Sequence, residues 1–214
     1  MRYRMAAWLV LALPLLGCAE MRRPAPAARI PGVLHAANPD PVMGVVGQAA
    51  EAFADGGRSL ANDPARMARA AAQVEVMTAE FARDLRWAPL SPGVGFELRG
   101  ARVELRSALG IRAGADPDQV IRALAAAHAA LVRGDRQAAA AALDPALFEP
   151  GGAGNLAYLS RPGPLSQSRI ATALARDEVA RLVRSNVWGL AASLDPDAGW
   201  LDPQPGRGMG IGPR

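Results

Sequence analysis

The chain has 214 residues, enough for one ordinary domain with a hydrophobic core of its own. Its net charge is +4 and it contains no lysine, which excludes Schiff-base chemistry and the lysine of a phosphate-binding loop. Arginine alternates with Asp and Glu, and no stretch is persistently basic, so we expect no nucleic-acid partner. The chain has one cysteine, so no disulfide can form within it.

Residues 1–17 have the features of an export signal. Arg2 and Arg4 give a positive start, and residues 5–16 form an apolar run interrupted only by Pro14. The run is too short for a membrane-spanning helix, which needs about 20 apolar residues. We therefore expect residues 1–17 to be a signal peptide that is removed.

The apolar run ends in Leu15-Leu16-Gly17-Cys18. This segment resembles the lipobox of bacterial lipoproteins, in which an aliphatic and a small residue precede a cysteine. The resemblance covers this segment alone. It implies that signal peptidase II cleaves after Gly17 and that Cys18 carries a diacylglyceryl group with palmitate-type acyl chains. Two or three such chains give a lasting membrane anchor.

The residue after the cysteine is Ala19 and not aspartate. In the sorting preference of enterobacterial lipoproteins this implies the outer membrane more than the inner one, with the protein facing the periplasm. Residues 18–41 contain five prolines, which prevent a helix, and we expect them to form an extended tether.

Helical patterns begin at position 42 and continue to position 192. A first helix is expected over 42–54. A second begins at Asp63-Pro64, an N-cap followed by the residue favoured at the first helical position, and stops near Trp87.

The segment 96–109 fits two structures. In a helix, Leu98 and Leu105 share one face. In a hairpin with its turn at Gly100, Glu97 would face Glu104, which is unfavourable. We favour the helix because the neighbouring segments are helical and the residues are good helix formers.

Two further helices are expected over 116–134 and 135–143, followed by a loop rich in Pro and Gly over 149–165. A long helix should cover 166–192, with Ser166 or Ser168 as its N-cap. Residues 193–214 should form a poorly ordered tail. The fold class is thus an all-α, single-domain bundle of five to six helices. The expected apolar side of the last helix comprises Ile170, Leu174, Val179, Leu182, Val183, Val187 and Leu190.

Reactive side chains are few. The only thiol is assigned to lipid, and the two histidines are His35 in the tether and His128 in an alanine-rich helix. No motif indicates a nucleophile, a metal site or a cofactor. We therefore expect no enzyme, no metal and no cofactor. A contact surface is expected beside the Pro/Gly loop, formed by Asn155, Tyr158, Ser160 and Gln167.

These features predict a membrane-anchored envelope lipoprotein whose helical domain is a non-catalytic interaction or structural module, with an envelope protein as partner. One alternative is a small-ligand or lipid-binding protein. Another is a carboxylate-dependent hydrolase of cell-wall glycan, which requires two acidic side chains in one cleft.

Overall fold

The computed structural model describes residues 30–35, 40–83 and 87–188. The lipobox, the signal segment and the expected tail lie outside these residues. Within them the fold is all-α, as the sequence predicts, and its only β-type pairing is an isolated bridge between Ile111 and Phe148. None of the helices described is long and apolar enough to span a membrane.

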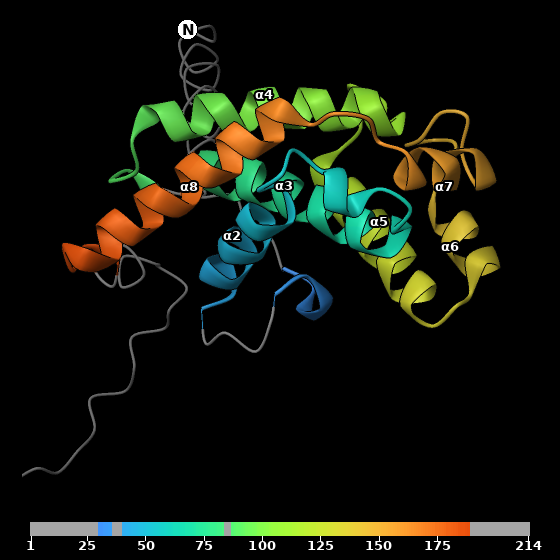
Figure 1. The fold of residues 1–214 in the computed structure, drawn as a ribbon, viewed down its shortest axis with the longest axis horizontal. Coiled ribbons are helices and arrows are strands. Elements are labelled where there is room, and N and C mark those ends of the chain that lie inside the picture. The colour runs from blue at the N-terminus through green and yellow to red at the C-terminus, as the bar shows by residue number, and fades with distance from the viewer. Residues whose placement is uncertain (1–29, 36–39, 84–86, 189–214) are drawn as a thin grey trace, which may run out of the picture.

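Seven α-helices and two short 3-10 helices make up the described chain (Figure 1). The sequence predicts five to six helices and does not include α7, which falls within the segment expected to be a loop. The elements are η2 (Gly32–Leu34), α2 (Pro41–Ala52), η3 (Arg58–Leu60), α3 (Pro64–Arg83), α4 (Pro92–Leu109), α5 (Pro117–Val132), α6 (Arg136–Ala142), α7 (Ala153–Ser160) and α8 (Ser166–Arg184).

Helix α3 is the centre of the bundle. It packs against α2, α4, α5 and α7, and every residue from 70 to 80 is buried. A helix surrounded on all sides must bury its polar residues as well as its apolar ones. The buried polar residues of α3 are Gln73, Glu75, Thr78 and Glu80. Helices α4 and α8 pack side by side along one edge of the molecule, while α6 and α7 lie at one end (Figure 1).

Helix starts follow local capping chemistry. The carboxylate of Asp116 accepts a hydrogen bond from the backbone nitrogen of Gln119 at 2.9 Å, and Asp63 accepts one from Arg66 at 2.9 Å. Both aspartates precede a proline, as the sequence indicates. The segment 96–109 is helical and belongs to α4, which ends at Gly110 in the left-handed conformation.

The expected apolar side of α8 is partly wrong. Ile170, Leu174 and Val183 are 44%, 37% and 45% exposed, whereas Ala171 and Ala175 are fully buried. Small residues face the core because they allow α8 to approach its neighbours closely. The larger aliphatic residues are consequently turned towards solvent.

The end of the segment expected to be an extended tether packs against the domain. Leu34, in η2, is fully buried, and its carbonyl accepts a hydrogen bond from Gln73 Nε2 at 2.7 Å. Ile30 also packs against the core. The bundle therefore includes residues that precede α2.

Candidate functional site: an arginine-lined pocket on α4

A buried ion cluster joins α3 to α4. Glu75 is 2% exposed and Arg106 is 5% exposed. Arg106 donates to the Glu75 carboxylate from Nε at 2.6 Å and from Nη2 at 3.0 Å, and Arg102 Nε lies 3.0 Å from Glu75 Oε2. Such a bidentate pair is among the stronger charge-assisted contacts in proteins. One carboxylate is thus shared between two guanidinium groups.

Arg106 also fixes the loop that follows α4. Its Nη1 donates to the carbonyl oxygens of Ala113 at 2.7 Å and Ala115 at 3.0 Å. In addition, the backbone nitrogen of Ile111 donates to the carbonyl of Arg106 at 2.8 Å. The loop 110–116 is therefore held to the same buried charge that joins α3 to α4.

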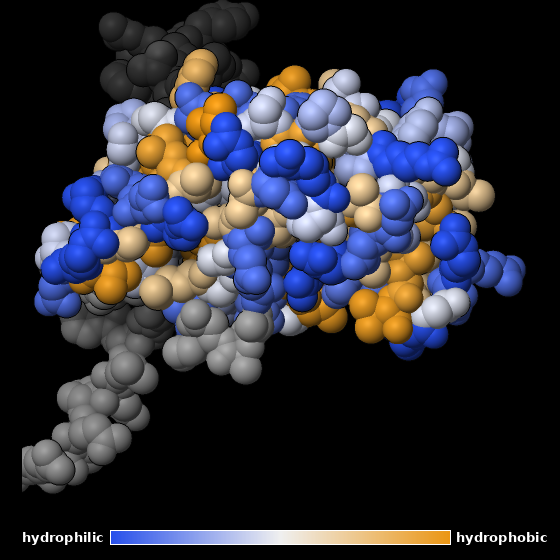
Figure 2. Space-filling model, viewed as in Figure 1, coloured by the Kyte–Doolittle hydropathy of each residue, from blue (hydrophilic) through white to orange (hydrophobic). Residues whose placement is uncertain are grey.

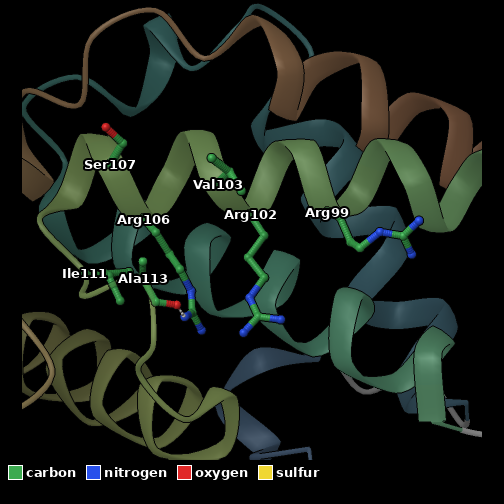
Figure 3. A pocket seen from close by; sticks show the side chains of 7 residues that line it. All are labelled: Arg99, Arg102, Val103, Arg106, Ser107, Ile111 and Ala113. Atoms are coloured by element: carbon green, nitrogen blue, oxygen red, sulfur yellow. Dashed lines mark hydrogen bonds between the residues drawn. The ribbon is translucent and has the colours of Figure 1, made fainter.

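A pocket of about 480 Å³ opens beside this loop, and we call it the arginine pocket (Figure 3). Three of the side chains that line it are arginines on one side of α4, at spacings of three and four residues that bring helical positions together. None of its lining residues is acidic. The pocket is lined by Arg99, Arg102, Val103, Arg106, Ser107, Ile111 and Ala113.

The three arginines differ in burial and in the contacts that their guanidinium groups make. Arg106 is buried and hydrogen-bonded through Nε, Nη1 and Nη2, while Arg102 is partly exposed, with 24% of its side chain accessible. Arg99 is exposed and makes no ion pair or side-chain hydrogen bond to the residues that the structure describes. The pocket therefore has a fixed inner guanidinium and an available outer one.

An apolar groove lies next to the pocket and shares Arg99 and Val103 with it. Phe96 and Val103 are 67% and 69% exposed, and Ile170 and Leu174 of the adjacent α8 are also exposed. Hydrophobic patches interrupt the hydrophilic surface over α4 and α8 in Figure 2. The groove measures about 500 Å³ and is lined by Phe96, Arg99, Gly100, Val103, Glu104 and Gln167.

The four residues expected to form a contact surface do not lie in one pocket among those described. Asn155 is 1% exposed; its Oδ1 accepts from the backbone nitrogen of Gly151 at 2.6 Å, and its Nδ2 donates to the carbonyl of Leu109 at 2.6 Å.

The other three residues differ in their surroundings. Tyr158 is 43% exposed on α7, and Ser160 lines a separate open depression of about 600 Å³. Only Gln167 reaches the apolar groove, where its side-chain amide donates to Glu97. The use of these residues in binding stays a prediction.

His128 is half-buried on α5. Its Nδ1 lies 2.9 Å from the carbonyl oxygen of Ala65 in the first turn of α3. Burial lowers the pKa of His128 below its usual value, because the charged imidazolium loses hydration. In the described part of the chain no three His, Cys, Asp or Glu side chains are arranged to hold a metal ion.

Sequence reasoning missed the arginine pocket. The signal was present, since Arg99, Arg102 and Arg106 follow a helical spacing, but Glu75 lies 31 positions from Arg106 and nothing local connects them.

Comparisons of the chain with protein-family models, with curated proteins and with solved structures gave no match. The site is thus defined by its geometry and by the charges that line it.

Proposed function

We propose that the chain is a lipid-anchored lipoprotein of the bacterial cell envelope, whose helical domain binds another envelope protein and catalyses no reaction. The lipobox at Leu15-Leu16-Gly17-Cys18 supports the anchor. The observation that supports the binding role is the apolar groove, where Phe96 and Val103 are two-thirds exposed on a helix whose opposite side packs into the domain. Exposed contiguous apolar surface on a soluble domain typically marks a contact site.

The chemistry of the groove indicates the partner. Phe96 and Val103 are seven positions apart on α4, so an amphipathic helix laid along α4 can contact both. Arg99 lies between them and has no ionic partner among the described residues. A partner helix with an apolar stripe and a neighbouring carboxylate satisfies both features.

A cell-wall hydrolase is less well supported. Among the residues that line the three pockets described, the only acidic one is Glu104. Both of its carboxylate oxygens accept hydrogen bonds from the start of α8. Hydrolysis of a glycan requires two carboxylates that face each other across a cleft. The lining of these three pockets does not provide such a pair.

The anchor is tested by intact mass and membrane fractionation of the protein from its host, beside Cys18→Ala. We expect a mature chain that starts at Cys18 with two or three acyl chains, and a variant that is unanchored or unprocessed. An unmodified, unanchored wild-type chain would overturn this part of the proposal.

The binding role is tested by placing a photo-crosslinking side chain at Val103 in the anchored protein. We expect one cross-linked envelope protein, lost in a Phe96→Ser background and retained in Val132→Ser. Val132 is the matched control because it is equally exposed (67%) but lies on α5. Equal cross-linking in both backgrounds would contradict docking on the groove.

A further inference from the structure

We propose that the arginine pocket binds a small amphiphile with a phosphate or carboxylate head. The anionic head lies beside Arg99 and Arg102, and the apolar part lies against Val103, Ile111 and Ala113. This inference needs neither the lipid anchor nor the protein partner.

The first argument is charge. Arg102 and Arg106 share one carboxylate, that of Glu75, and Arg99 adds a third guanidinium without an ionic partner among the described residues. None of the residues that line the pocket is acidic. A planar guanidinium matches phosphate and carboxylate oxygens in geometry and in charge. An anion is therefore the ligand that this lining favours.

The second argument is that the pocket is pre-formed. Its wall at Ile111 and Ala113 belongs to the loop that Arg106 fixes from beneath, through the carbonyls of Ala113 and Ala115. Arg112, between Ile111 and Ala113, is held as well, because its backbone nitrogen donates to the carbonyl of Leu147 at 2.9 Å. A ligand consequently does not have to order this wall, and less of its binding free energy is lost.

The third argument distinguishes an amphiphile from a bare anion. Val103 exposes 69% of its surface, Ala113 is also exposed, and the buried Ile111 completes the apolar part of the lining. A volume of about 480 Å³ lies within the range of small-molecule sites and greatly exceeds a single phosphate. An apolar chain attached to the head covers this surface and gains hydrophobic free energy.

The test titrates the full chain calorimetrically with hexyl phosphate in the presence of phosphatidylcholine nanodiscs, whether or not the chain is anchored in them. We expect saturable binding that weakens by about tenfold or more in Arg99→Glu, because a charge-assisted contact becomes a repulsion. Arg122→Glu is the matched control: this residue is an exposed arginine on α5 that does not line the pocket. Equal weakening in both variants, or no binding by the wild type, would overturn the proposal.

Two further variants separate the pocket from its surroundings. Ala113→Trp fills the pocket from an exposed position and leaves every arginine in place, so it should abolish binding. Phe96→Ser removes a side chain that lines the apolar groove and not the arginine pocket, so it should leave hexyl phosphate binding unchanged. Loss of partner cross-linking with retained anion binding would thus separate the two proposals. Retained cross-linking with loss of anion binding would contradict the anion site alone.

Two comparisons identify the source of the head group. Inorganic phosphate should bind at least about tenfold more weakly than hexyl phosphate, because it buries no apolar surface; equal affinities would refute the amphiphile. Replacing phosphatidylcholine by phosphatidylglycerol in the nanodisc supplies a lipid whose phosphate has no choline cation to balance its negative charge. Competition with hexyl phosphate then indicates a membrane lipid as the source, and unchanged titration indicates a free amphiphile.

Discussion

The carboxylate of Glu104 on α4 accepts hydrogen bonds from the backbone nitrogen and the hydroxyl of Ser168 on α8, at 2.8 and 2.7 Å. It also accepts one from the backbone nitrogen of Gln167 at 3.0 Å. The first amides of a helix lack partners within the helix, and a negative charge there is favourable. The start of α8 is therefore capped by a residue 64 positions earlier in the chain, and the serine N-cap expected from the sequence is not formed.

Removing this cap should weaken the α4–α8 contact. We expect Glu104→Ala to lower the free energy of unfolding by about 1 to 2 kcal/mol, the range for a lost helix cap. Urea denaturation followed by circular dichroism measures the change. Glu51→Ala is the control, since Glu51 is exposed on α2 and its side chain makes no hydrogen bond in the described structure. Equal losses in the two variants would argue against a capping role.

Breaking the Glu75–Arg106 ion pair should lower the free energy of unfolding more than replacing both partners by apolar residues. Glu75→Gln leaves Arg106 buried without its counter-charge, and we expect a loss of about 3 to 5 kcal/mol in the free energy of unfolding. The double variant Glu75→Met with Arg106→Met removes both partners of the buried pair and leaves only the partly exposed Arg102, so it should recover much of that loss. Chemical denaturation of the two variants side by side tests this; a double variant no more stable than Glu75→Gln would contradict it.

His128 predicts a pH dependence of stability. Because burial lowers its pKa in the folded state, the unfolded state binds the proton more readily. Stability should therefore be highest above the usual value of about 6.5 and be lost as the pH falls from there through the lowered folded pKa. His128→Asn should flatten this part of the profile. Urea midpoints between pH 7.5 and 5 provide the measurement, and an unchanged slope in the variant would assign the effect elsewhere.

Asp40 has two roles that one substitution should expose. Its Oδ1 caps α2 by accepting from the backbone nitrogens of Val42 and Met43, and its Oδ2 accepts from Trp188 Nε1 at 2.6 Å. We expect Asp40→Ala to cost about 1 to 2 kcal/mol of unfolding free energy.

A second substitution separates the two roles of Asp40. Trp188→Phe keeps an aromatic ring near Trp87, whose centroid lies 5.0 Å away, and should cost less. Thermal unfolding of both variants tests whether Asp40→Ala lowers stability more than Trp188→Phe. A larger loss of stability in Trp188→Phe would contradict this prediction.

The sequence predicted those parts of the fold that depend on neighbouring residues. Asp63-Pro64 and Asp116-Pro117 each place a cap and a proline at a helix start, and both starts are confirmed. Helix α7 was missed because the Pro/Gly stretch around it indicates a loop. Within that stretch, Asn155 holds the turn at Gly151 by a hydrogen bond. The contribution of this hydrogen bond to stability depends on the burial of Asn155.

The side of α8 that faces the core was missed for a different reason. Hydrophobicity alone favours Ile170 and Leu174 as core residues, but close helix packing selects Ala171 and Ala175. The arginine pocket depends on a pairing between Glu75 on α3 and Arg106 on α4, and the spacing of either residue within its own helix does not identify the other. Long-range pairing and packing distance were thus the information that a single sequence did not provide.

The hydrogen bond between Asp40 and Trp188 spans 148 positions, and it has a consequence in time as well as in space. Contacts between residues so distant in the chain form late, because the intervening chain must first be brought together at an entropic cost. Helix α8 also completes the surfaces of α2 and α4. A growing chain therefore leaves these faces of α2 and α4 uncovered until the residues of α8, Ser166–Arg184, have been synthesised.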